Sequence, residues 1–157
     1  MPDMLVKLYN LPNVAHFLKV VSKKKIEIRH PKPWDKNTVI DWVENNFSEW
    51  WAHECEAAFR TFPPSCFIAV KKNKIVGFAC YDCTAMNFFG PTGVAEEEQG
   101  NGIGKALLLA ALNKMRSNGY GYAIIGAVGP AEFYKKIVGA TIIEDSEPGI
   151  YTEELND

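Results

Sequence analysis

Apolar residues along the chain follow two spacings, one typical of strands and one typical of helices. Residues 26–29 alternate isoleucines with Glu27 and Arg29, and Pro31 follows, which predicts a short strand that ends there. Residues 4–11 alternate more weakly and are interpreted as a first strand, while 14–24 have helical spacing. Two further helices are predicted over 35–62, because their apolar residues recur on one helical face before a Pro-Pro pair.

Three closely spaced strands are predicted in the middle of the chain. The first two lie within 66–83 and flank a turn in which Asn73 can take the left-handed conformation. The third covers 87–95 and contains two glycines and a proline, which are poor residues for a regular ladder. They indicate a bulge, or a place where something lies against the backbone.

The last third of the chain alternates helices and strands. The elements expected there are a helix over 102–118, a strand over 122–128, a short helix over 131–138, and closing strands within 140–146 and 149–155. The whole pattern indicates a mixed α+β domain whose sheet is covered by helices.

Composition narrows the class of protein. The chain has 157 residues, 47% hydrophobic and 23% charged, which suits a single globular domain. Its net charge of -2 gives no reason to expect a nucleic-acid partner, and the basic run 23–25 is interpreted as a solvated turn. No stretch is long and apolar enough to span a bilayer, and the N-terminus lacks a signal-peptide pattern, so we expect no membrane partner and a cytoplasmic location.

The cysteines are expected to be ordinary reduced thiols. The chain contains Cys55, Cys66, Cys80 and Cys83. Cys80 and Cys83 form a CxxC, but residues three apart on a strand point to opposite faces and cannot readily hold one ion. Because no second CxxC or HxxxH completes a site, we expect no metal.

A glycine-rich loop opens the helix over 102–118. Residues 99–104 read Gln-Gly-Asn-Gly-Ile-Gly, and bare backbone at a helix N-terminus lets an anion approach unpaired N–H groups. A Walker A loop is excluded because Ala106 follows Lys105 where a hydroxyl is needed. A dinucleotide fingerprint is excluded because no Asp or Glu occurs between Lys105 and Ala131. A tight turn without a ligand remains the alternative.

Two stretches resemble the GNAT superfamily of N-acetyltransferases and occur in that family's order. The first is a strand ending in Val94, a short loop, and a Q-x-x-G-x-G run over 99–104 that opens a helix. The second is a strand followed by a helix that carries Phe133-Tyr134 and ends in Gly139-Ala140. The two signatures together are much more specific than the glycines alone.

The resemblance implies a GNAT-like α+β fold with a mixed, mostly antiparallel sheet flanked by helices and splayed between the fourth and fifth core strands. It implies one domain over 1–157, in which 1–24 form an N-terminal extension. The implied co-substrate is acetyl-CoA, and the implied activity is transfer of its acetyl group to a primary amine of a small molecule or protein, by direct attack through a tetrahedral intermediate. The alternative is a sensor or pseudoenzyme that binds CoA or acetyl-CoA on the same scaffold. A monomer or a homodimer is expected.

The resemblance also implies a set of site residues. The residues expected to hold acetyl-CoA are Gly93, Val94, Gln99, Gly100, Asn101, Gly102, Ile103, Gly104 and Lys105. The Val94 backbone N–H would hold the oxyanion, and Tyr134 would be the general acid to the leaving thiolate, the alternative being a packing role for this tyrosine. Neither the base nor the acceptor pocket is fixed by the family. The candidate bases are Glu54, Asp82 and Glu96, and the candidate pocket residues are Trp50 and Trp51, which equally suit core packing.

Overall fold

A single mixed sheet organises the protein, for which the structure, a computed structural model, describes residues 1–152 and 155–156. The strands are β1 (Met4–Lys7), β2 (Ile26–Arg29), β3 (Cys66–Lys71), β4 (Lys74–Tyr81), β5 (Phe88–Val94), β6 (Tyr122–Ile125) and β7 (Thr141–Ile142). Their order is β2-β3-β4-β5-β6-β1-β7, and all neighbours are antiparallel except the β5–β6 pair. The expected fold class is thereby confirmed.

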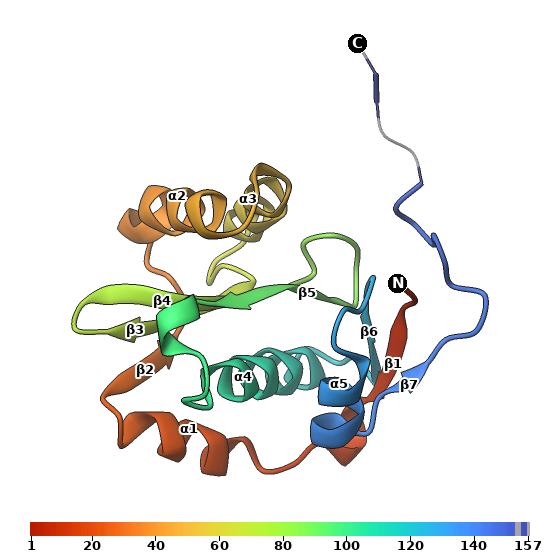
Figure 1. The fold of residues 1–157 in the computed structure, drawn as a ribbon, viewed down its shortest axis with the longest axis horizontal. Helices are drawn as coiled ribbons and strands as arrows, with labels where there is room; N and C mark the ends of the chain where they lie inside the picture. Colours follow the sequence, from red (N-terminus) through yellow and green to blue (C-terminus); the bar gives the residue numbers. More distant parts are fainter. Residues whose placement is uncertain (153–154, 157) are drawn as a thin grey trace.

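Helices cover both faces of this sheet (Figure 1). They are α1 (Val14–Ser22), α2 (Lys36–Asn46), α3 (Glu49–Glu56), α4 (Ile103–Ser117) and α5 (Ala131–Val138). In Figure 1, α2 and α3 lie above the sheet, whereas α4 lies below it between the strands and α1. Two hydrophobic cores result, one on each face of the sheet.

The lower core fixes the position of α4. Its long apolar surface is buried on more than one side, because the sheet covers one stripe and α1 covers another. Leu107, Leu112 and Met115 are fully buried. Burial of each such side chain stabilises the fold by about 1.5–3 kcal/mol. The N-terminus of α4, where the glycine loop ends, is therefore held rigidly against the end of β5.

The upper core joins α2 and α3 to β3 and β4. Aromatic rings dominate it, with Trp42, Phe47 and Trp51 packed around the fully buried Phe78. The ring centroids of Phe47 and Phe78 are 5.6 Å apart. Stacked and edge-on aromatic pairs of this kind favour one arrangement of the helices over the sheet.

Residues 1–24 provide an inner strand and a helix. Met4 pairs with Ile125 of β6 on one side and with Ile142 of β7 on the other, so β1 lies inside the sheet. β7 is only two residues long. Of the closing strand expected over 149–155, residues 149–152 and 155 do not form a strand, and 153–154 lie outside the described residues.

Within the part of the chain that the structure describes, no helix combines the length and the apolar character that crossing a bilayer requires.

Candidate functional site

A cleft of about 690 Å³ opens beside the last five residues of β5. β5 pairs with β6 only at Phe88–Ile124 and Phe89–Ile125, after which β6 ends and β5 continues to Val94. Gly90 to Val94 therefore have no ladder partner on this side among the described residues. The cleft is bounded by this free edge, the glycine loop, the chain from Ile125 to Pro130, and α5.

The pairing of β5 with β4 orients the Val94 backbone toward the cleft. Val94 lies opposite Gly77, and the next residue, Ala95, donates its N–H to the carbonyl of Val76 at 2.8 Å. In an antiparallel ladder, hydrogen-bonded pairs alternate with pairs that are not hydrogen-bonded. Val94 and Gly77 are thus a non-hydrogen-bonded pair, and the N–H of Val94 points away from β4 into the cleft.

Unpaired backbone N–H groups gather at the glycine loop. The amides of Gly100, Asn101 and Gly102 donate no hydrogen bond within the described chain. The first three helical residues of α4 add amides that no helix can pair internally. With the partial positive charge of the helix end, these groups form a cradle suited to a pyrophosphate.

Each glycine around the cradle has its own physical reason. Gly100 and Gly102 have φ of 86° and 82°, the left-handed region that glycine adopts without strain. Gly104 is helical, and a Cβ there would lie 3.8 Å from Cγ2 of Val94, inside the cleft. Gly93 is different, because a Cβ there would lie 2.4 Å from the Phe47 ring in the upper core. Packing alone therefore explains the absence of a side chain at Gly93.

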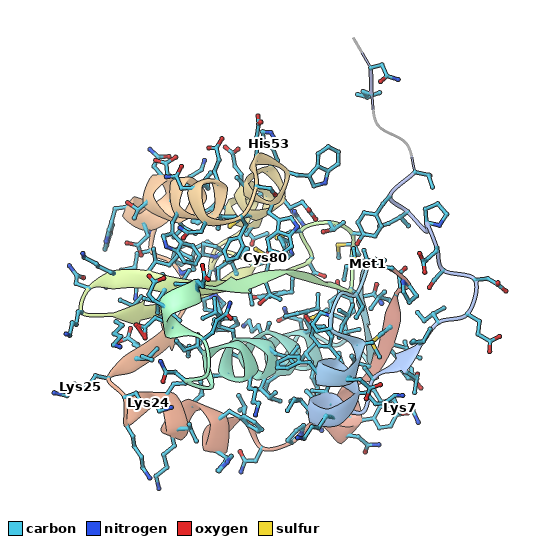
Figure 2. All side chains as sticks on the ribbon, in the orientation of Figure 1. Met1, Lys7, Lys24, Lys25, His53 and Cys80 are labelled. Atoms are coloured by element: carbon cyan, nitrogen blue, oxygen red, sulfur yellow. The ribbon has the colours of Figure 1, made fainter. Side chains whose placement is uncertain are left out.

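The third glutamate before the loop holds the loop in place. The carboxylate of Glu98 accepts two hydrogen bonds from Nζ of Lys71 on β3, at 2.9 and 3.0 Å. It accepts a third from Nδ2 of Asn101 at 3.2 Å. The carbonyl of Asn101 in turn accepts from Nζ of Lys24 at 3.2 Å. Lys24 belongs to the basic run 23–25, which is exposed beside α1 (Figure 2). This run is therefore solvated, as expected, and one of its lysines also contacts the glycine loop.

Loss of the Lys71 charge should weaken binding of acetyl-CoA, the co-substrate that the resemblance implies. Glu98 lines the cleft, and Lys71→Gln leaves its carboxylate uncompensated near the proposed phosphate position. We expect the Kd to rise about 3- to 10-fold, since a partly exposed ion pair contributes about 1 kcal/mol. Calorimetry should show no such change for Lys74→Gln, which removes the same charge from an exposed position of the next strand. Equal affinities of the two variants would contradict this role for Lys71.

Tyr134 lies on α5 and lines the same cleft as Val94. Its ring is packed edge-on against Phe133 and Phe89, with centroids 5.1 and 6.4 Å away. The residue is only 6% exposed. Within the described chain its hydroxyl has no hydrogen-bond partner and is accessible to solvent. The oxygen therefore opens into the cleft. Burial raises the pKa of Tyr134 to about 12, so the phenol stays protonated at neutral pH.

One of the two tryptophans expected at an acceptor pocket lines the cleft. Trp51 lines the cleft, whereas Trp50 is exposed on the outer side of α3. Glu54 follows Trp51 by one helical turn and accepts a hydrogen bond from the hydroxyl of Thr84. Burial raises the pKa of Glu54, an effect that the bond from Thr84 opposes.

The other two candidate bases are Asp82 and Glu96, which the structure places in two different turns. Asp82 has a left-handed φ of 55° and closes the β4–β5 turn, with its carboxylate accepting from the N–H of Asn87 at 2.8 Å. Glu96 is exposed on the 3-10 turn Glu96–Glu98. None of the three candidate side chains lines the cleft itself. Glu54 lies one helical turn from the cleft-lining Trp51, and the carbonyl of Glu96 accepts from the N–H of the cleft-lining Gln99 at 3.3 Å.

Several residues at the site escaped the sequence interpretation. Asp3 is buried, and its carboxylate accepts from the N–H of Ala127 at 2.8 Å, which fixes the turn between β6 and α5. The hydroxyl of Tyr151 lies so close to Gly126 that a Cβ there would be 2.0 Å away from it. Burial, together with the charges of Asp3 and Glu54, raises the pKa of Tyr151 to about 12. These contacts join residues far apart in sequence, so no local pattern could indicate them.

Solved structures of acetyltransferases share this fold. The glucosamine N-acetyltransferase region of a fungal multi-domain β-N-acetylglucosaminidase superposes with a TM-score of 0.74 at 15% identity, covering 90% of this chain and 19% of that one. A GCN5-related N-acetyltransferase from Sphaerobacter thermophilus superposes with a TM-score of 0.70 at 20% identity, covering 90% of this chain and 48% of that one. A GNAT family acetyltransferase from Brucella melitensis, solved with acetyl-CoA, superposes with a TM-score of 0.56 at 18% identity, covering 75% of this chain and 86% of that one. At these identities the likeness shows the fold alone.

The family of this chain is shown by a comparison with family models. A separate comparison with curated proteins found no match. This chain spans about a fifth and about half of the first two structural relatives. The model of the Acetyltransferase (GNAT) family matches residues 36–140, which is more than half of the chain and includes both the glycine loop and Tyr134. The protein therefore belongs to the GNAT acetyltransferase family.

Proposed function

We propose that the protein transfers the acetyl group of acetyl-CoA to a primary amine. The observation that carries this proposal is that Gly100 and Gly102, whose amides are unpaired, line the same cleft as Val94 and Tyr134, whereas Asn101 does not line it. Acetyl-CoA would supply an activated thioester to this cleft. The loop fits its pyrophosphate, because the loop combines unpaired N–H groups, left-handed glycines and a helix N-terminus without an acidic first turn.

Val94 and Tyr134 would stabilise the two charges of the reaction. The Val94 N–H points into the cleft and is suited to an oxyanion that develops on the carbonyl oxygen. Tyr134 would donate a hydrogen bond to the departing sulfur. A thiol has an ordinary pKa of about 8.5, well below the value of about 12 for Tyr134. We therefore assign Tyr134 the role of a hydrogen-bond donor whose proton stays mainly on its own oxygen.

The amine must lose a proton before it can attack. An alkylamine has a pKa near 10 and is mostly charged at neutral pH, so a base has to accept that proton directly or through water. We propose Glu54 for this role, because it lies one turn from Trp51 and is half-buried beside Thr84. The face of Trp51 offers the approaching ammonium group a cation–π contact before it is deprotonated.

Replacement of Glu54 should slow turnover. Glu54→Gln keeps the shape and the contact with Thr84 but removes the acceptor for a proton, and we expect kcat to fall about 100-fold with little change in the Kd of acetyl-CoA. Glu56→Gln is the matched control, since it removes the same charge from an exposed position two residues away. Steady-state kinetics of the two variants with the same amine measures the difference in kcat. Equal kcat values for the two variants would remove Glu54 from the mechanism.

Two measurements test the proposed function. The first is a thermal shift with acetyl-CoA, which should raise the melting temperature because a ligand that binds only the folded state stabilises it. The second is detection of free CoA thiol while a panel of primary amines is supplied as acceptors. Stabilisation combined with amine-dependent thiol release supports the acetyltransferase. Stabilisation without release from any amine would favour the sensor alternative, and no stabilisation at millimolar ligand would refute both.

A further inference from the structure

The cysteines of this chain meet at one place in the upper core. Cys66 and Cys80 are directly opposite each other on β3 and β4, and Cys55 reaches them from α3. All three are fully buried, and their sulfur atoms lie within 4.8 Å of one another. Figure 2 shows Cys80 between the sheet and the helices above it.

Cys83 lies at the edge of this group, outside the three thiols that lie within 4.8 Å of one another. A continuous strand would have turned Cys80 and Cys83 to opposite faces, but β4 ends at Tyr81 and Asp82 takes a left-handed φ of 55°. This turn brings the Cys83 thiol back into contact with that of Cys80. Cys83 is partly exposed, and its sulfur lies 3.6 Å from the hydroxyl of Ser65. It therefore stands at the rim of the buried group.

This arrangement is not what packing alone would produce. A single buried cysteine behaves as a small apolar side chain, and thiols are weak hydrogen-bonding groups, so contacts among them add little stability. Yet three of the four cysteines of the 157-residue chain converge, from α3, β3 and β4, and the fourth, in the loop after β4, contacts Cys80. Convergence of thiols from three separate elements is typical of a metal centre.

The distances also suit a cation. Sulfur ligands surround Zn²⁺ tetrahedrally at about 2.3 Å, which places the sulfur atoms about 3.8 Å apart. The three buried thiols need only small side-chain rotations to reach this spacing from within 4.8 Å. Soft thiolates select zinc and cuprous ions over hard cations such as Mg²⁺ or Ca²⁺.

We propose that Cys55, Cys66 and Cys80, with Cys83 as the fourth ligand, form a structural site for one thiophilic cation, Zn²⁺ in the first place. Binding replaces the thiol protons, which leave to solvent, by bonds to the cation, and no oxidant or reductant is needed. The site is separate from the acetyl-CoA cleft, whose lining contains no cysteine among the described residues. It nevertheless adjoins the acceptor side, because Cys55 follows Glu54 and Cys83 precedes Thr84 in the chain. A bound cation would therefore tie α3 to the β4–β5 loop where Glu54 and Thr84 meet.

Metal content and cobalt spectroscopy of the full, untagged chain test this site. The protein purified without chelator should contain about one equivalent of zinc by mass spectrometry of the elements. After the metal is removed under reducing conditions, added Co²⁺ should give the sulfur-to-cobalt charge-transfer band and the visible bands of tetrahedral thiolate coordination, and Zn²⁺ should displace it. A reduced, folded protein that takes up neither ion would overturn the proposal.

Three variants separate ligation from folding. Cys55→Ala should reduce bound metal at least about tenfold, whereas Val39→Ala, which opens a comparable space in the same core, should retain it. Cys83→Ala alters only the partly exposed rim and should keep the fold while weakening Co²⁺ binding at least about tenfold. Full metal content in Cys55→Ala would place the ion elsewhere and refute the site. Unchanged affinity in Cys83→Ala would refute its assignment as the fourth ligand.

Discussion

Gly104→Asp is expected to raise the Kd of acetyl-CoA about 100-fold or more, a loss of about 2.7 kcal/mol in binding free energy. The backbone at Gly104 is helical, so an aspartate adds no left-handed strain, and its Cβ would make only an ordinary contact, 3.8 Å from Cγ2 of Val94. The new carboxylate lines the cleft beside the unpaired amides of the loop. Two unit charges of the same sign about 5 Å apart repel by about 3 kcal/mol at an effective dielectric constant of about 20. Calorimetry with acetyl-CoA measures the change.

Two comparison variants separate charge from shape and from fold damage. Gly104→Asn has nearly the same size without the charge and should lose much less affinity than Gly104→Asp. Gly121→Asp places the same charge at an exposed glycine around which a Cβ meets nothing within 4 Å, and it should bind acetyl-CoA as the parent protein does. Parent-like affinity of a folded Gly104→Asp variant would show that the pyrophosphate does not bind at this loop.

Tyr134→Phe is expected to lower kcat about 10- to 100-fold while leaving the Kd of acetyl-CoA nearly unchanged. A hydrogen bond to a charged group contributes about 1.5–3 kcal/mol, and the departing sulfur carries full charge only as the thioester breaks. The ring contacts with Phe89 and Phe133 remain, so the fold should be unaffected. Single-turnover kinetics measures the chemical step directly. Tyr122→Phe, which removes an exposed hydroxyl from β6, is the matched control.

The pH dependence of the rate tests whether Tyr134 stays protonated, and so able to donate, at a pH where an ordinary tyrosine ionises. Because burial raises the pKa of Tyr134 to about 12, the protonated form that donates persists above its unperturbed value of about 10. The proposed acetyl-transfer rate of the parent protein should therefore not fall between pH 8 and about pH 10 through ionisation of this residue. An unchanged rate in Tyr134→Phe, or a fall in the parent with a midpoint well below 10 that the variant lacks, would contradict the assigned role.

Local patterns in the sequence predicted the elements on which the site depends. The spacing of apolar residues predicted α4, and the alternation of 26–29 predicted β2, because these periods follow from the geometry of one helix or one strand. The left-handed conformations of Gly100 and Gly102 are likewise local, since a residue without Cβ adopts them at little cost. The phosphate cradle could therefore be expected from the order of residues along the chain.

Other features depended on contacts between distant segments. The sequence could not distinguish the three glutamates 96–98, because only the pairing of Glu98 with Lys71 separates it from its exposed neighbours. Nor could it show that Gly93 lacks a side chain on account of Phe47, 46 positions earlier in the chain. Among the candidate bases, the structure placed Asp82 in a turn and Glu54 beside the cleft-lining Trp51.

The amino-acid order was sufficient to predict the class of fold, the order of its elements, the glycine cradle and the helix that carries Tyr134. All of these follow from short-range periodicity and from the backbone freedom of single residues. Contacts through space were needed to establish that β1 lies inside the sheet, that the Val94 amide points into the cleft, and that three of the four cysteines lie together with the fourth beside them. The first two features depend on strand register, because a shift of one residue reverses the side that each group faces. The position of Cys83 depends on the left-handed Asp82 at the end of β4.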